Sequence, residues 1–297
     1  MILCKLASMR ETVLPRFAGI AAGLLAGLLL SGAAFAEGAG EGHAVPGQMG
    51  LQRGTTPLAH EMHWFHDVLL LPIITVICLF VLGLLVWVAL KFNEKVHPVP
   101  SRTTHNSVLE VAWTIIPVLI LVVIAIPSFR LLTKQLVLPD ADITMKVTGK
   151  QWYWTYEYPQ DQGGGFSFDS LLKPDADLKP DDIRLLAVDN EAVVPVNKTI
   201  RVQVTAADVI HSFVVQSFGA RIDAVPGRLN ETWFKPEKEG VYYGQCSKLC
   251  GKDHAYMPIA FRVVSEQDYA AWLADAKKKY ASNNGKPVAV AAAETEH

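Results

Sequence analysis

The sequence predicts two membrane-spanning helices followed by a soluble all-β domain that ends in a helix. Two long apolar runs predict the membrane helices, and a series of short β-rich runs between residues 143 and 264 predicts the β domain. Hydrophobic residues make up 51% of the 297 residues, a share that suits a chain with one membrane part and one soluble part. The net charge of -2 gives no information about nucleic acid, but the sequence has no basic stripe or nucleic-acid motif, so no nucleic-acid partner is expected.

Residues 1–36 have the features of a cleaved secretory signal peptide. Basic residues precede an apolar run over residues 17–30, and residues 34–36 supply a small-x-small cleavage pattern. The alternative, an uncleaved first transmembrane helix, is disfavoured because the apolar run is short. Residues 37–57 are rich in glycine and show no periodicity, so they predict a loose mature N-terminus.

Residues 37–135 are expected to contain both membrane helices, at about 68–90 and 108–132. The first run has no charged residue and is long enough to cross a hydrocarbon core of about 30 Å. The second run contains Pro117 and Pro127, which membrane helices tolerate where neighbouring groups satisfy the freed carbonyls.

The loop between the two runs predicts how the chain is oriented. Lys91, Lys95 and Arg102 lie in this loop against a single acid, Glu94. The positive-inside rule therefore places the loop in the cytoplasm and the β domain outside. A cleaved signal peptide predicts the same side for the β domain.

Residues 136–281 are expected to form the soluble β domain. Its β-rich runs are residues 143–147, 152–158, 199–205, 212–216, 231–234, 240–243 and 259–264. Short strands separated by turn residues indicate a sandwich or a barrel. Residues 159–182 are expected to form a long surface loop instead.

A capping pattern begins at Ser265, and apolar residues follow it at helical spacing. This pattern predicts a terminal helix that lies on the sheet or against a neighbouring subunit. Residues 282–297 are polar and rich in alanine, and they are expected to be disordered.

Five side chains with metal-binding chemistry stand close together in the sequence or just upstream. They are His211, Cys246, Cys250, His254 and Met257. Thiolate and thioether are soft donors, and their combination with imidazole favours copper. Two alternatives remain at this point: a Cys246–Cys250 disulfide, which would need neither the histidine nor the methionine, and a zinc site, which rarely uses methionine.

Six motifs occur in a specific order along the chain. They are residues 110–114, 151–159, 188–190, 208–212, 223–228 and the cysteine segment 244–257. With these motifs the chain resembles subunit II of haem–copper cytochrome c oxidases of the bacterial and mitochondrial type. The resemblance implies two membrane helices carrying a cupredoxin-like Greek-key β-sandwich. It also implies a bacterial inner-membrane protein, crossing the membrane more than once, with its copper domain in the periplasm.

The resemblance implies a binuclear copper centre, CuA, that accepts electrons from cytochrome c. Electrons then pass to haem in subunit I, where O2 is reduced to water and protons are pumped, so the chain is one subunit of an oxidoreductase. Cys246 and Cys250 would bridge both coppers. His211 and Met257 would complete one copper. His254 and the backbone carbonyl of Lys248 would complete the other.

Lys248 departs from the family pattern, which usually has glutamate there. The copper bond would use the backbone carbonyl, so the copper centre is expected to survive the change. The family's glutamate also helps to hold a magnesium ion at the boundary with subunit I. An ammonium group cannot ligate a cation, so magnesium binding by subunit II is doubtful in this chain.

Trp152 resembles the exposed residue through which the family takes up electrons. Alternating aromatic residues at positions 152, 154 and 156 would by pattern alone favour packing, and Trp154 and Tyr156 should share the face of Trp152. The lysine-rich face of cytochrome c, whether soluble or membrane-anchored, implies an acidic docking surface. Its expected members are Glu157, Asp161, Asp189 and Asp208, and residues 157–191 contain nine acids against three bases.

Three further residues have roles only by resemblance. Glu110 matches a glutamate at the mouth of a proton pathway into subunit I, although a solvated interfacial carboxylate is the usual fate of such a residue. Asp223 and Arg228 are expected at the interface with subunit I, either as an ion pair or as part of a turn. Subunit III and the lipid bilayer are the other implied partners.

Two other classes of protein share some of these features. A membrane-tethered copper chaperone or thiol protein would need one anchor, and neither Met257 nor the aromatic run. A quinol oxidase subunit shares the fold but is expected to lack the cysteine pair. No Cys-x-x-Cys-His motif occurs, which excludes a fused c-type haem domain.

Overall fold

The computed structural model describes residues 42–280. The expected signal peptide over 1–36 and the expected disordered tail over 282–297 therefore lie outside the described residues. The chain divides into two compact units, residues 1–53 and 54–297. In the first unit the side chain of Gln48 accepts a hydrogen bond from the Val45 backbone N–H at 3.0 Å, which closes a turn.

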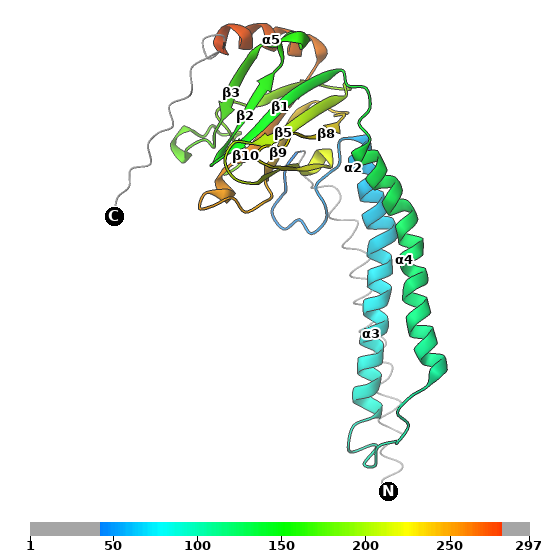
Figure 1. Ribbon diagram of the computed structural model, residues 1–297. Coiled ribbons are helices and arrows are strands. Elements are labelled where there is room, and N and C mark those ends of the chain that lie inside the picture. The colour runs from blue at the N-terminus through cyan, green and yellow to red at the C-terminus, as the bar shows by residue number, and fades with distance from the viewer. Residues whose placement is uncertain (1–41, 281–297) are drawn as a thin grey trace. The chain divides into compact units, whose positions relative to one another are not determined.

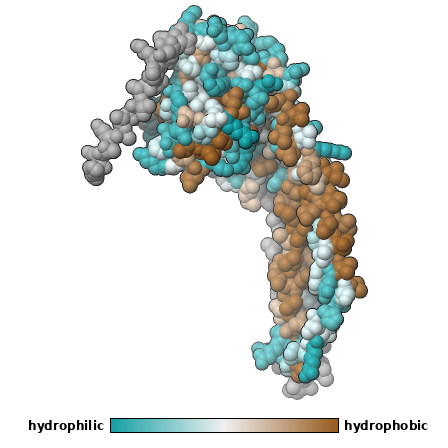
Figure 2. Space-filling model, in the orientation of Figure 1, coloured by the Kyte–Doolittle hydropathy of each residue, from teal (hydrophilic) through white to brown (hydrophobic). Residues whose placement is uncertain are grey.

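Two long helices follow in the second unit. The first is a continuous helical run of 35 residues, Pro57–Lys91, made of α2 (Pro57–Trp64), the π-helical turn η1 (Phe65–Leu70) and α3 (Leu71–Lys91). The second is α4 (Ser107–Leu136), which continues through both of its prolines. Hydrophobic residues predominate on the surface of these helices in Figure 2. The most apolar stretch of each helix is not buried within the protein. The chain is a membrane protein, and the part of it that the structure describes, residues 42–280, contains two spans.

The first helix begins earlier than its apolar run predicted. Thr56 caps it, because its Oγ1 accepts a hydrogen bond from the Ala59 backbone N–H at 3.0 Å, and Pro57 fits the first helical position. The start of the helix also bonds to the β domain. Thr56 Oγ1 donates to the carbonyl oxygen of Phe218 at 2.8 Å, and Thr55 is buried beside it. These residues are thus ordered, although the sequence predicted a loose segment up to residue 57.

The soluble part is a sandwich of two five-stranded sheets (Figure 1). The strands are β1 (Ile143–Lys150), β2 (Tyr153–Tyr158), β3 (Phe166–Ser170), β4 (Ala192–Pro195), β5 (Ile200–Ala206), β6 (His211–Val215), β7 (Ala220–Ala224), β8 (Asn230–Phe234), β9 (Gly240–Cys246) and β10 (Pro258–Val264). One sheet has the order β3-β2-β1-β5-β8 and the other β4-β10-β9-β6-β7. The β1–β5 and β10–β4 pairs are parallel and the remaining pairs are antiparallel.

Side chains that alternate along the strands fill the space between the sheets. On β5, for example, Ile200, Val202 and Val204 are fully buried while the residues between them are partly exposed. Phe261 lies at the centre of the aromatic packing, with ring centroids 5.5 Å from Phe234 and 5.9 Å from Phe213. This apolar core makes the sandwich a stable support for the loops at its ends.

The segment 159–182 is not only a surface loop, as had been predicted. It contains β3, which pairs with β2 and buries Phe166, Phe168 and Ser170. The alternation Phe-Ser-Phe-Asp-Ser has the period of a half-buried strand, but the Gly, Pro and Asp residues around it obscured that signal. The short strands β4 and β7 were also missed.

The terminal helix α5 (Glu266–Tyr280) packs on the chain's own sandwich. Ser265 caps it, with its Oγ accepting a hydrogen bond from the Asp268 backbone N–H at 3.1 Å. The ring centroid of Trp272 lies 5.2 Å from that of Tyr158, at the far end of β2 from Trp152. The prediction of a helix laid on the sheet is confirmed.

Candidate metal centre

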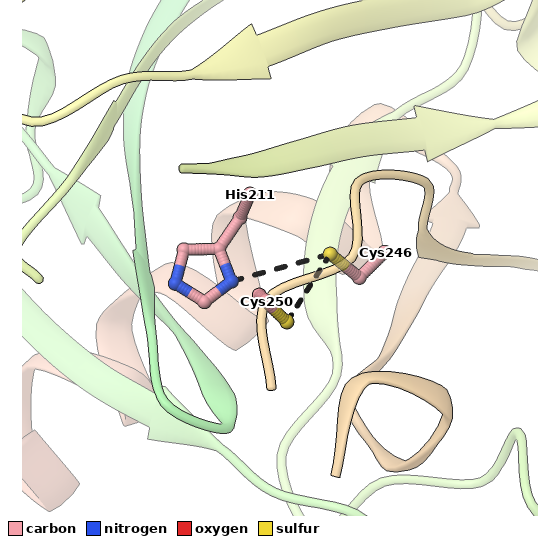
Figure 3. Close-up of side chains that lie close together, drawn as sticks. All are labelled: His211, Cys246 and Cys250. Atoms are coloured by element: carbon pink, nitrogen blue, oxygen red, sulfur yellow. Dashed lines mark hydrogen bonds between the residues drawn. The ribbon is translucent and has the colours of Figure 1, made fainter. Parts of the chain in front are cut away.

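Two strand ends bring the first three candidate ligands together. His211 is the first residue of β6 and Cys246 is the last residue of β9, and Cys250 lies in the loop that follows β9 (Figure 3). Cys246 Sγ is 4.0 Å from His211 Nδ1 and 3.9 Å from Cys250 Sγ. The ligand atoms of these three buried residues all lie within 4.8 Å of one another.

The other predicted ligands join the same cluster. Cys250 Sγ lies 3.5 Å from His254 Nδ1 and 3.5 Å from Met257 Sδ. Cys246 Sγ lies 3.3 Å from the backbone carbonyl oxygen of Lys248. All six donor atoms inferred from the sequence are therefore neighbours in space.

The distance between the two sulfurs decides between a disulfide and a metal site. A disulfide bond is about 2.05 Å long, whereas these sulfurs are 3.9 Å apart and both thiols are free. Two sulfurs at this separation can both lie about 2.3 Å from one metal ion placed between them. Thiolates, imidazoles and a thioether form a donor set that fits copper.

The surroundings shift the pKa values of the two thiols in opposite directions. Burial alone would raise the pKa of Cys246, but hydrogen bonding with His211 and with the backbone outweighs burial and lowers the pKa to about 6. Burial and the neighbouring charge of Cys246 raise the pKa of Cys250 to about 12. Cys246 thus loses its proton more readily than Cys250, and a cation that binds both sulfurs displaces the protons that remain.

Asp208 holds His211 in place from the outer side. The Asp208 carboxylate accepts hydrogen bonds from His211 Nε2–H at 2.8 Å and from the backbone N–H groups of Gln151 and Val209, each at 2.6 Å. With Nε2 bonded in this way, Nδ1 faces the sulfur of Cys246 at 4.0 Å. A carboxylate that orients a ligating histidine is a common second layer of metal sites, and the sequence did not indicate this role.

Trp152 lies directly against the cysteine loop. Its Nε1–H donates to the backbone carbonyl of Cys250 at 3.2 Å, and the side-chain amide of Gln151 donates to the same carbonyl at 2.9 Å. Gly251 closes the contact, because a Cβ there would lie 2.9 Å from Trp152 Cζ2. Gln151 is a site residue that sequence reasoning missed, since an amide beside a tryptophan carries no distinctive signal.

The aromatic run divides into one half-buried and two buried residues. Trp152 is half-buried and precedes the strand, while Trp154 and Tyr156 are fully buried in the core. Trp154 Nε1–H donates to the backbone carbonyl of Met257 at 3.1 Å. Trp154 and Tyr156 therefore have the core-packing role that the alternating aromatic pattern favoured. Trp154 also supports the metal loop through its hydrogen bond to Met257.

The remaining predicted acids have varied surroundings. Glu157 forms an ion pair with Lys146 at 3.2 Å, and Asp189 accepts hydrogen bonds from backbone N–H groups at 2.7 Å. Asp161 is exposed, and Glu110 is half-buried in the first turn of α4.

Of the two arrangements expected for Asp223 and Arg228, an ion pair or a turn, the structure has the turn at Arg228 and no ion pair between these two residues. Asp223 pairs with Lys248, whose Nζ lies 3.4 Å from Asp223 Oδ2, while the exposed Arg228 belongs to the turn at Gly227. A hydrogen bond with Ser212 and the nearby charge of Lys248 hold the pKa of Asp223 below its usual value.

These observations define a membrane-anchored β-sandwich protein with a soft-ligand metal centre at one end of the sandwich. The family model for the cytochrome c oxidase subunit II periplasmic domain matches residues 143–264, and that for the transmembrane domain of the same subunit matches residues 44–131. The chain belongs to the cytochrome c oxidase subunit II family.

Individual proteins agree with this assignment. The chain is 54% identical over 239 residues to a probable cytochrome c oxidase subunit 2 of Rickettsia bellii, covering 80% of this chain and 87% of the relative. It is 48% identical over 251 residues to cytochrome c oxidase subunit 2 of Cereibacter sphaeroides, covering 80% and 82%. A crystal structure of the periplasmic domain of subunit II from Bradyrhizobium japonicum is 62% identical, with a TM-score of 0.45, and covers 48% of this chain and 99% of that one.

Membership of the family identifies the general biochemistry. Subunit II belongs to a haem–copper oxidase complex, an oxidoreductase, and its cupredoxin-like periplasmic domain is the copper-binding part. The copper-chaperone alternative is not favoured.

The role of Asp208 in orienting His211 can be tested by removing its charge. We expect Asp208→Asn to weaken copper binding by about 10–100-fold, because the amide cannot replace the carboxylate as acceptor for three donors. Copper dissociation constants of the purified chain in detergent measure this effect. Asp161→Asn, at an exposed acid, is the matched control. Equal copper affinities for the two variants would contradict the role of Asp208.

Proposed function

We propose that this chain takes up electrons from cytochrome c through a binuclear CuA centre and delivers them to haem in subunit I of a bacterial cytochrome c oxidase. The observation that carries the proposal is the convergence of six donor atoms around the two sulfurs of Cys246 and Cys250. A copper pair bridged by two thiolates accepts and releases one electron with little change in bond lengths. Oxygen reduction and proton pumping belong to the rest of the complex.

Each ligand has a proposed role within this centre. Cys246 and Cys250 would be shared by the two metals, and their sulfurs lie at a separation that permits shared binding. His211 and Met257 would help to hold one copper, whereas His254 and the carbonyl of Lys248 would help to hold the other. Burial of the sulfurs and of His211 excludes water and limits rearrangement of the ligands during electron transfer.

Trp152 is the proposed point of electron uptake at the protein surface. The hydrogen bond from its indole to the carbonyl of Cys250 supports this role, because it is a direct contact between a surface aromatic and a bridging ligand. The proposed docking acids for cytochrome c are Glu157, Asp161, Asp189 and Asp208. Charge pairing of this kind raises association rates and weakens with salt, so an association rate that is independent of salt would exclude it.

The membrane arrangement is proposed from the same charges that orient the chain. The basic loop after α3 faces the cytoplasm, the β domain of residues 136–281 lies in the periplasm, and residues 1–36 are removed as a signal peptide. Glu110, at the cytoplasmic end of α4, then receives protons for subunit I. Proton uptake that is unchanged in Glu110→Gln would exclude this role. Asp223 and Arg228 face subunit I.

The binuclear centre is tested by metal content and spectroscopy. We expect the purified chain in detergent to bind two coppers and to give a mixed-valence electron paramagnetic resonance signal, because both thiolates are shared between the metals. Cys250→Ser should abolish that signal, and Cys78→Ser should preserve it, since Cys78 lies on α3 outside the site. A mononuclear signal from the unmodified chain would contradict the proposal.

The role of Trp152 is tested by a conservative change. Trp152→Phe removes the hydrogen bond to the Cys250 carbonyl, so we expect slower reduction of copper by cytochrome c in the intact oxidase. The copper spectrum should stay unchanged because no ligand is altered. Normal transfer rates in this variant would rule out electron uptake through Trp152.

Lys248 is proposed to leave the magnesium site without a ligand from subunit II. Its ammonium group lies 3.4 Å from Asp223 and places a positive charge where the family's glutamate would add a negative one. We expect Lys248→Glu to increase Mn2+ binding to the intact oxidase, measured by electron paramagnetic resonance. A metal ion ligated by residue 248 in the unmodified complex would refute this proposal.

A further inference from the structure

A lysine lies over the aromatic ring at the proposed site of electron uptake. Lys252 Nζ is 5.6 Å from the ring centroid of Trp152, within the range of a cation–π contact. The Lys252 side chain is 78% exposed. A positive charge thus stands at the surface of the residue that a donor protein has to approach.

The indole ring cannot easily turn away from this charge. Its Nε1–H is bonded to the Cys250 carbonyl, and its Cζ2 edge packs against Gly251, where a Cβ would come within 2.9 Å. Gly251 also has a φ of +127°, which L side chains rarely adopt. Lys252 is the next residue along the chain, so the turn that fixes the ring also carries the lysine beside it.

Within residues 42–280, the ion-pair partner of Lys252 is its neighbour Asp253. The carboxylate of Asp253 lies 3.9 Å away, at the outer limit for an ion pair. Asp208, one of the proposed docking acids, already accepts hydrogen bonds from three donors. The other lysine of the loop, Lys248, pairs with Asp223 instead. The charge of Lys252 is therefore presented to an incoming protein.

We propose that Lys252 is a specificity-determining residue for the electron donor. It selects a donor that carries a carboxylate beside its electron-transfer edge, within an otherwise basic docking face. This inference rests on the proposed function, in which Trp152 receives the electron. An entirely lysine-rich face would meet a like charge at the centre of contact, whereas a carboxylate there could pair with Lys252.

The contact with Trp152 does not prevent this exchange of partners. An exposed cation–π contact shifts an equilibrium by only about two- to fivefold, so the ammonium group can leave the ring to meet a donor carboxylate. The charge itself remains near the surface, and its effect on association falls as salt screens it.

The test compares two donor proteins of opposite surface charge on the intact oxidase. The probes are an oxidised lysine-rich soluble cytochrome c and the same protein after succinylation of its lysines, which reverses their charge. We expect Lys252→Gln to raise the association rate of the lysine-rich form about two- to threefold at low salt and to lower that of the succinylated form by a similar factor. Both differences should vanish at high salt, and Lys252→Arg should behave as the unmodified oxidase does.

Lys277→Gln is the matched control, because it removes the same charge from α5. Figure 1 shows α5 at the end of the sandwich away from the loop between β9 and β10. A Lys252→Gln variant that changes neither association rate, or that behaves as Lys277→Gln does, would overturn the inference. An oxidised donor binds without transferring an electron, so this experiment measures binding alone. The Trp152→Phe experiment measures electron transfer, and normal transfer there would overturn only electron uptake through Trp152.

Discussion

The metal centre depends on the pairing of β6 with β9. In this antiparallel pair Phe213 lies opposite Cys246, so the first residue of one strand and the last residue of the other are neighbours. Close approach of the strands requires Gly244, since a Cβ there would lie 1.9 Å from the carbonyl oxygen of Val214. The backbone N–H of Ser247 continues the contact by donating to Ser212 at 3.0 Å. Backbone pairing thus brings together ligands that are 35 residues apart in the chain.

A second set of hydrogen bonds connects the protein surface to this centre. The carboxylate of Asp208 joins His211 to the backbone of Gln151, and the carbonyl of Cys250 joins the cysteine loop to Gln151 and Trp152. In both connections the partners are Gln151 or Trp152, the two residues of the turn between β1 and β2. Trp152, the proposed site of electron uptake, and the candidate copper ligands are therefore held by the same few groups, which limits their relative motion.

The two lysines of the copper loop illustrate how position decides the effect of a charge. Lys248 reaches Asp223 on β7, whereas Lys252 lies over the ring of Trp152. Both are exposed basic residues near a metal ligand in the sequence. Their different directions in space are the reason why the role proposed for Lys248 concerns a cation site and the role proposed for Lys252 concerns the electron donor.

The sequence by itself determined the two membrane spans, the all-β domain and the identity of the candidate ligands, because hydrophobic period and donor chemistry are local properties. It did not reveal β3, whose alternation is short and surrounded by turn residues, nor the part played by Gln151. Tertiary structure alone decided that the thiols are separate, that Asp208 orients His211, and that Lys252 covers Trp152. Each of these depends on a distance between segments remote in the chain, and strand pairing sets such distances.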